Sequence, residues 1–299
     1  MVSDTGRACL DWKASCSRPG LAWRSVGAAA SVPRCFRVDA RRATWRRVFP
    51  VLLHVGDFPV ATYGVLFALG IFVGIAIAAW RAPQVGVSPD VVWEVGILVV
   101  VGTMVGSRAE YVRTHWSMFA DDFSTLLAYR DGGMVFYGGF VTSVVAIIVY
   151  GRLRHVNALA VFDAIAPYVM IGASIGRFGC LAAGCCYGSA TDLPWAITFP
   201  DGAVAPALIA RHPTQVYESI YALAIGLFLA WVPRSFVGQR FALLMLLYGT
   251  ARFGNEFLRG DVRRGFAVEG LLTNGQLTSM FMIGGGVFLW WLARKRTIA

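Results

Sequence analysis

Charged residues are scarce in this chain, and regular alternation of apolar and polar residues is missing. Only 15% of the 299 residues are charged, whereas 57% are hydrophobic and the mean hydropathy is +0.60. A soluble domain of this length would rarely be so apolar. A β-barrel needs alternating strands of about 10 residues, and the apolar runs here are longer and continuous. Excluding both classes leaves a protein built of membrane-spanning helices.

Long apolar stretches fill the chain from residue 58 to residue 293. Because a helix needs about 20 mainly apolar residues to cross a bilayer, we predict an all-α polytopic membrane protein with about seven transmembrane helices. The predicted spans are 58–80, 91–111, 133–150, 161–181, 215–232, 240–258 and 276–293. G-x-x-x-G pairs, which let helices approach closely, occur at Gly70/Gly74, Gly102/Gly106 and Gly172/Gly176.

Residues 1–50 differ in composition from the rest and form a predicted Arg-rich arm. Residues 1–48 contribute +7 of the net charge of +10, and they contain no apolar run long enough for a signal peptide or a span. We expect this arm to be disordered or to result from a start codon placed upstream of a natural start near Val51. A transit peptide and an arm that binds anionic lipid are alternatives. Nucleic-acid binding is not indicated, because residues 51–299, the predicted membrane domain, are far less basic.

Short basic loops predict the orientation of the membrane domain. The loop between the first two spans, the next two alternate loops and the C-terminal tail are basic, so we expect them in the cytoplasm. Their basic residues are Arg81, Arg152, Arg154, Arg234, Arg240, Arg294, Lys295 and Arg296. The N-terminus of the domain would then face outward, together with the proline-rich loop 182–214.

Three of the six cysteines lie together where the fourth predicted span ends. Cys180, Cys185 and Cys186 form a C-x4-C-C pattern, which does not match the common zinc spacings. We therefore predict no metal site. Small packing residues in a tight helix end are the first interpretation, and a disulfide or redox role is the alternative.

Two glycine-flanked clusters could bind a ligand. Tyr137, Gly138 and Gly139 end a GGMVFYGG stretch at 132–139, which indicates either a helix entry close to a ligand or a simple turn. Arg177 ends an apolar span and is followed by glycines, among them Gly188. An arginine there could hold a phosphate with two hydrogen bonds, or it could extend to the lipid headgroups.

Two further clusters combine charge with a predicted helix. Arg252, Glu256 and Arg259 are spaced i, i+4, i+7, so they should share one helix face inside the bundle. Glu256 could hold both arginines for an anionic headgroup, or the three could form a structural ion pair. His212, followed by a proline suited to a first helical turn, could be a base, a headgroup ligand or a capping residue.

Taken in order, these clusters resemble the prolipoprotein diacylglyceryl transferase family over residues 51–296. Besides the glycine-flanked Arg177, the resemblance rests on Asp57-Phe-Pro with Tyr63-Gly64, Gly106-Ser107-Arg108-x-x-Tyr111, GGMVFYGG at 132–139, HPTQVYE at 212–218 and YGTARFGNEFLRGD at 248–261. It implies an enzyme of the bacterial plasma (inner) membrane. Such enzymes move the diacylglyceryl group of phosphatidylglycerol to the lipobox cysteine of a preprolipoprotein signal peptide. A thioether forms, glycerol phosphate leaves, and no cofactor is needed.

The resemblance and the clusters together define the candidate site. The catalytic candidates are Arg177, Arg252, Tyr137 and Glu256. The substrate-binding candidates are Tyr63, Arg108, Gly138, Gly139, Gly188, His212 and Arg259. Because the leaving group is a phosphate ester, fixed cations in a low-dielectric cavity would stabilise its developing charge.

The chain departs from the family pattern at three positions. Tyr137 replaces a histidine, and Cys180 and Cys185 replace an asparagine and a glutamate. A tyrosine with its usual pKa near 10 is a poor base at neutral pH. A paralogue with another lipid or acceptor is therefore an alternative. A seven-helix transporter of a small anion or lipid is another, although the repeats typical of transporters are missing, and a seven-helix receptor is a third.

Overall fold

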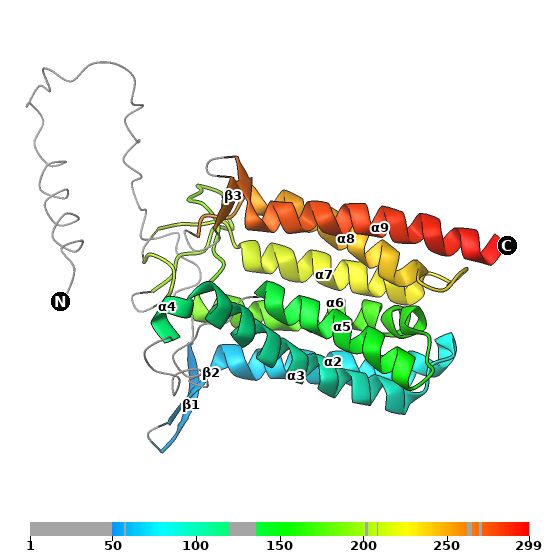
Figure 1. Cartoon of the computed structure of the whole chain (residues 1–299). Helices are drawn as coiled ribbons and strands as arrows, with labels where there is room; N and C mark the ends of the chain where they lie inside the picture. The colour runs from blue at the N-terminus through cyan, green and yellow to red at the C-terminus, as the bar shows by residue number, and fades with distance from the viewer. Residues whose placement is uncertain are drawn as a thin grey trace, which may run out of the picture. The chain divides into compact units, whose positions relative to one another are not determined.

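A computed structural model describes residues 50–56, 58–119, 136–200, 203–207, 209–261, 265–268 and 271–298. The predicted arm lies almost entirely outside the described residues, as does the beginning of the predicted span 133–150. Within the described part, seven helices of 18 residues or more run side by side (Figure 1). Each of them overlaps one predicted span.

The long helices are α2 (Thr62–Arg81), α3 (Pro89–Thr114), α5 (Phe136–Leu153), α6 (Ala158–Ala183), α7 (Thr214–Trp231), α8 (Gln239–Glu256) and α9 (Asn274–Ile298). Two short helices, η1 (Ala82–Val85) and α4 (Trp116–Phe119), follow α2 and α3. Four segments are long and apolar enough to cross a membrane: Thr62–Val85, Pro89–Thr114, Ala158–Ala183 and Asn274–Lys295. The protein is thus a mainly helical, multi-pass membrane protein.

Two small antiparallel hairpins accompany the helices. β1 (Val51–Val55) pairs with β2 (Phe58–Ala61), and β3 (Phe266–Val268) pairs with β4 (Leu272–Thr273). Gly56, with a φ of +61°, provides the left-handed residue that a tight reversal between β1 and β2 requires. The strands are too short for an alternating pattern to show in the sequence. In Figure 1 the hairpins and α4 lie at the end of the bundle opposite the C-terminus.

Helix α6 is the central helix of the bundle. In its apolar window 56% of the residues are buried, against 22–33% in the other three candidate spans. A β-carbon on Gly74 of α2 would lie 2.9 Å from the carbonyl oxygen of Tyr168, so the two backbones touch. On the other side, Ser219 of α7 donates a 2.8 Å hydrogen bond to the Ser174 carbonyl of α6. The predicted packing of the glycine pairs on α2 and α6 is confirmed.

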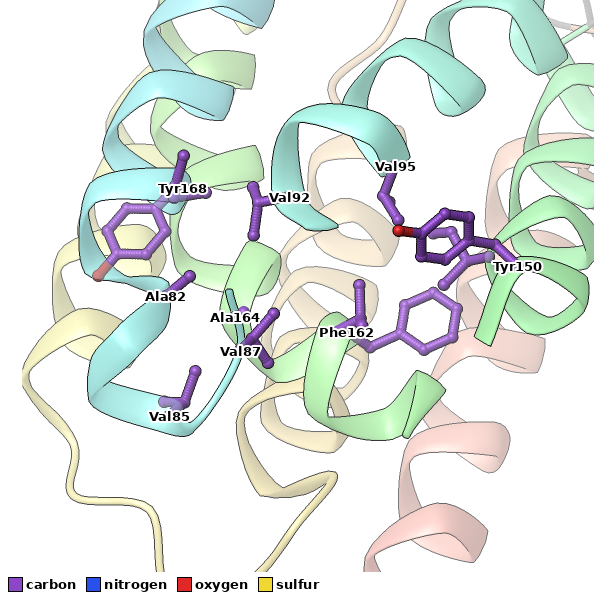
Figure 2. Close-up of a cluster of buried hydrophobic side chains, with 13 residues drawn as sticks. Ala82, Val85, Val87, Val92, Val95, Tyr150, Phe162, Ala164 and Tyr168 are labelled. Atoms are coloured by element: carbon purple, nitrogen blue, oxygen red, sulfur yellow. The ribbon is translucent and has the colours of Figure 1, made fainter. Parts of the chain in front are cut away.

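The largest apolar core closes the end of the bundle opposite the hairpins. There α2, η1, the start of α3, the end of α5 and the start of α6 meet. In Figure 2, Val95 of α3 lies close to Tyr150 of α5, whereas Val92 lies on the side of Ala164 and Tyr168 of α6. Outside this core, large apolar side chains such as Phe281 remain exposed, as expected for helices that face lipid. Apolar packing dominates this end, although the buried carboxylate of Asp163 also lies there.

Candidate active site

A buried carboxylate joins two arginines from different helices at the hairpin end of the bundle. Arg177, near the end of α6, places Nη2 2.6 Å from Oε1 of Glu218 in the first turns of α7. Nη1 of Arg252, near the end of α8, lies 3.7 Å from Oε2 of the same carboxylate. The Glu218 side chain is only 4% exposed. In such a low-dielectric place, ionic interactions are much stronger than in water.

The chain of ion pairs continues beyond Arg252. Its Nη2 lies 3.0 Å from Oε2 of Glu256, which also lies 3.6 Å from Nη1 of Arg259. Arg259 in turn makes two hydrogen bonds to Asp261, of 2.8 and 2.7 Å. We call these alternating charges the arginine network: Arg177, Glu218, Arg252, Glu256, Arg259 and Asp261. Three cations face three carboxylates, so their formal charges balance.

Two tyrosines complete the network on the side of α7 and α8. The Tyr248 hydroxyl donates a 2.8 Å hydrogen bond to Glu218, and the Tyr221 ring lies against Tyr248 with centroids 6.0 Å apart. Tyr221 also interacts electrostatically with Arg177 and Arg252. Within the described residues, the buried Tyr221 hydroxyl and Nη1 of Arg252 have no hydrogen-bond partner. Two unused donors beside two cations are suited to an anion.

The predicted shared helix face is right for Arg252 and Glu256 and wrong for Arg259. Helix α8 ends at Glu256, and the following N–H groups bond to carbonyls three residues earlier, as from Arg259 to Glu256. This tighter turn still brings Arg259 to Glu256. Burial is the largest single influence on Arg259 and opposes its charge, but the hydrogen bonds to Asp261 together with the charges of Cys186, Asp261 and Glu256 raise its pKa above the usual range.

The chain reverses sharply after α6, in the segment that holds the cysteines. Gly184 caps the helix with a φ of +70°, and Cys186 has a φ of +57°, in the left-handed region that residues with a β-carbon seldom adopt. The Gln215 amide donates to the Cys185 carbonyl and the Thr214 hydroxyl to the Cys186 carbonyl, each at 2.6 Å. The beginning of α7 thus holds this segment beside Arg177.

The three cysteine sulfurs converge next to the network. Those of Cys180, Cys185 and Cys186 all lie within 4.8 Å of one another. Nη1 of Arg177 lies 3.9 Å from the sulfur of Cys180 and 4.0 Å from that of Cys186. Hydrogen bonds from the other two thiols, with Arg177 and Arg259 nearby, lower the pKa of Cys186. Of the His, Cys, Asp and Glu side chains described, these three form the group that could hold a metal ion.

Gly188 fits where only a glycine can lie. Its N–H donates a 3.1 Å hydrogen bond to the His212 carbonyl, and a β-carbon on it would lie 2.5 Å from the β-carbon of His212. It also forms an isolated β-bridge with Arg259. The His212 ring lies with Nδ1 3.4 Å from the Tyr217 hydroxyl. Gly188 and His212 therefore position the segment between α6 and α7 through their backbones.

Tyr63 and Arg108 lie on α2 and α3. Tyr63 is 39% exposed and interacts electrostatically with Arg177 and the three thiols, which places it at the site. Arg108 is buried, with its guanidinium 5.6 Å from the ring centroid of Tyr111 and 5.4 Å from that of Phe119. A role of Arg108 in substrate binding stays a prediction.

Gly138 and Gly139 lie in the first turns of α5, against α3. A β-carbon on Gly138 would lie 2.5 Å from the β-carbon of Glu110, and one on Gly139 would lie 2.9 Å from the Thr103 carbonyl oxygen. Both glycines permit close helix packing, and their predicted substrate contacts stay a prediction. Tyr137 is at the start of the same helix, and its side chain lies outside the described residues.

The sequence interpretation gave no role to Glu218, Tyr221, Tyr248 or Asp261. Glu218 carried a usable signal, because a carboxylate at the start of an otherwise apolar span is costly unless it is paired. Tyr221 follows it by three residues and therefore lies on the same helix face. The pairing of Glu218 with arginines of two other helices could not be read from any spacing.

Comparisons with known proteins identify the family of the chain. The family model described as prolipoprotein diacylglyceryl transferase matches residues 50–292. The chain is 31% identical over 249 residues to the phosphatidylglycerol–prolipoprotein diacylglyceryl transferase of Clostridium tetani, covering 83% of this chain and 98% of that protein. It is 32% identical to the second such transferase of Clostridium perfringens, over 80% and 93% of the two chains, and 34% identical to that of Methylococcus capsulatus, over 82% and 95%. With a family model matched over most of its length and relatives of this similarity, the chain belongs to the prolipoprotein diacylglyceryl transferase family.

Proposed function

We propose that this protein transfers the diacylglyceryl group of phosphatidylglycerol to the lipobox cysteine thiol of preprolipoproteins, forming a thioether and releasing glycerol phosphate. The names of its relatives state both substrates. The observation that carries the proposal is the pair Arg177 and Arg252, partly buried on either side of Glu218, where Nη1 of Arg252 and the nearby Tyr221 hydroxyl make no hydrogen bond among the described residues. A lipid phosphate is the anion that such a site within an apolar bundle would bind.

The arginines act on the leaving group. As the acceptor sulfur attacks the glyceryl carbon, the bond from that carbon to the phosphate oxygen breaks and negative charge grows on the phosphate. Nη1 of Arg252 and the Tyr221 hydroxyl bind that phosphate, while Arg177 faces it from α6. Glu256 holds Arg252 and Arg259 in position throughout. Because these donors are already oriented and shielded from water, little reorganisation is needed when the charge develops.

The remaining candidates surround this centre. Tyr63 lies beside Arg177, Tyr137 is kept as a candidate from its place in the sequence, and Gly188 and His212 shape the segment that approaches the headgroup. His212 is a reserve candidate for thiol activation. Arg108, Gly138 and Gly139 lie where α3 packs against α5, and we keep them as substrate-binding candidates.

The topology proposed for the reaction has seven transmembrane helices in the bacterial inner membrane. α5, α7 and α8 complete the set of spans, although α8 carries Arg240, Arg252 and Glu256. The basic residues at the ends of α2, α5 and α9 support a cytoplasmic position for that side. The arginine network then faces outward, where the signal peptide presents its cysteine. We keep residues 1–50 as the predicted Arg-rich arm and residues 51–299 as the membrane domain.

Incubation of the purified protein with phosphatidylglycerol and a lipobox peptide tests the proposal. Mass spectrometry should find the peptide heavier by one diacylglyceryl group, joined through its cysteine. Arg252→Ala should lower the rate by about 100-fold or more, as expected when a donor to the developing charge is lost. Arg154→Ala, which removes an exposed arginine paired with Glu94 at the other end, should leave the rate unchanged. Absence of product from folded wild-type protein, or an undiminished rate in Arg252→Ala, would refute the assignment.

A further inference from the structure

The geometry of the three cysteine thiols is close to that of a metal site. A Zn²⁺–sulfur distance of about 2.3 Å places the sulfurs of a tetrahedral site about 3.8 Å apart. The sulfurs of Cys180, Cys185 and Cys186 lie within 4.8 Å of one another. Small side-chain rotations, closing each pair by at most about 1 Å, would therefore bring all three to coordination distance.

The backbone around the thiols is built to hold them together. The left-handed φ of +57° at Cys186 turns the chain so that neighbouring cysteines direct their sulfurs into one cluster. Such a conformation costs about 1 kcal/mol or more, so the surroundings must maintain it. The 2.6 Å hydrogen bonds from Gln215 and Thr214 to the carbonyls of Cys185 and Cys186 do so. Packing of three small side chains alone would not require this arrangement.

The cluster provides three ligands and an open side. Among the residues that the structure describes, the group includes no fourth His, Cys, Asp or Glu. Cys180 is buried, whereas Cys185 and Cys186 are half-buried, so a ligand can approach from their side. Structural zinc sites have four protein ligands, while catalytic zinc sites have three and leave the fourth position to water or substrate. The cluster resembles the second kind.

Arg177 connects this cluster to the phosphate site. A divalent ion on three thiolates leaves a net negative charge, and Nη1 of Arg177 lies 3.9 and 4.0 Å from two of the sulfurs. Its Nη2 faces Glu218 at 2.6 Å. One guanidinium therefore lies between the thiol cluster and the network that we assign to the leaving phosphate.

We propose that Cys180, Cys185 and Cys186 bind one thiophilic metal ion such as Zn²⁺, and that this ion takes the acceptor cysteine as its fourth ligand. The proposal rests on the proposed transferase function. A metal-bound thiol is deprotonated, so the acceptor releases its proton to solvent on binding. The metal-bound sulfur then forms the new bond to the glyceryl carbon, and the electron pair of the broken carbon–oxygen bond leaves with the phosphate. No oxidant or reductant is required.

The described carboxylates of the arginine network are not available to remove the proton from the acceptor thiol. Glu218, Glu256 and Asp261 each form an ion pair with at least one arginine, so their oxygens already have partners within the network. A metal ion generates a thiolate without a basic side chain. The spacing of the cysteines did not indicate such a site, because the turn at Cys186 that brings them together is invisible in the sequence.

Metal binding can be measured without any turnover. The purified full chain should bind about one Zn²⁺, and Co²⁺ in its place should show a sulfur-to-cobalt charge-transfer band in the near ultraviolet. Cys186→Ser should weaken binding and diminish the band. The control variant, Cys35→Ser, likewise removes one thiol, from the predicted arm, and should change neither result. Equal binding in both variants, or no binding by wild type, overturns the proposal.

The fourth ligand is tested with a lipobox peptide added to the Co²⁺ protein. A peptide with cysteine should shift the band, and the same peptide with serine should not; a shift by both or by neither overturns the role of the ion in acceptor binding.

If Cys186→Ser fails to fold, the transfer rate of wild-type protein treated with a chelator is measured in its place. If it transfers diacylglyceryl groups at the full rate, the metal proposal is overturned and the transferase function stands. If metal and thiol bind but no product forms under any condition, the transferase proposal fails and the metal site stands.

Discussion

Glu218 is the residue on which the two arginines of α6 and α8 converge. Glu218→Gln keeps a hydrogen-bond acceptor for the Tyr248 hydroxyl. It removes the negative charge that pairs with Arg177, so the charge of Arg177 is left uncompensated inside the protein. We expect the free energy of unfolding to fall by roughly 3 kcal/mol and diacylglyceryl transfer to be lost. Thermal unfolding in detergent together with the peptide assay checks both effects.

The matched variant is Glu94→Gln, which breaks the exposed pair with Arg154. Because exposed ion pairs contribute little, its unfolding temperature and activity should stay close to wild type. Equal destabilisation by the two variants would contradict the role that we give to Glu218.

At Gly188 the prediction concerns steric fit and not charge. In Gly188→Ala the new methyl group would lie 2.5 Å from the His212 β-carbon, so the segment that carries Cys185 and Cys186 must move. We expect activity to fall by at least about 10-fold, as when reacting groups are misplaced by a fraction of an ångström. Gly254→Ala is the control, because nothing lies within 4 Å of a β-carbon there and alanine favours a helix. The peptide assay on both variants decides, and a normal rate in Gly188→Ala would argue against tight placement of this segment.

At the scale of the elements, α8 depends on a carboxylate of another helix. Asp163 of α6 is fully buried and accepts hydrogen bonds from the N–H groups of Gly238, at 2.7 Å, and Phe241, at 3.0 Å, where α8 begins. Asp163→Ala leaves these N–H groups unpaired and should lower the free energy of unfolding by about 2 kcal/mol. Asp163→Asn keeps one acceptor and should lose less. Thermal unfolding of the two variants measures this order, and an unchanged stability in Asp163→Ala would refute the capping role.

At the scale of the whole molecule, the two ends of the bundle differ in kind. The hairpins and the arginine network lie at one end, and the largest apolar core and the C-terminus at the other (Figure 1). On the proposed topology, green fluorescent protein fused to the C-terminus should fluoresce, whereas alkaline phosphatase inserted beside Asp192 should be active. Phosphatase inserted beside Ser235, in the connection between α7 and α8, is the control and should be inactive. The reverse pattern in cells would overturn the orientation.

The helices could be predicted from the sequence because apolar length is a local property. The ends were less certain: α6 begins at Ala158 where 161 was expected, and α8 stops at Glu256 where 258 was expected. The ends depend on capping contacts such as the Asn157 side chain accepting from Leu159. The pairing of Arg252 with Glu256 followed from helical spacing for the same local reason.

The rest of the site depends on contacts between distant segments. Glu218 meets Arg177 and Arg252 only because α7 packs between α6 and α8 in the bundle. The three thiols meet because Cys186 adopts a left-handed conformation, and Gly188 matters because His212 lies against it. None of these relations has a period or a fixed spacing along the chain.

The position of the arginine network at one end of the bundle has a consequence for the membrane itself. A phospholipid whose headgroup lies in the opposite leaflet cannot reach these arginines, so only one leaflet supplies the reaction. Every turnover removes a two-chain phospholipid from that leaflet and returns its chains attached to a protein. Sustained lipoprotein synthesis therefore depends on how quickly that leaflet is resupplied with phosphatidylglycerol, and the lipid asymmetry of the membrane becomes a control on the enzyme.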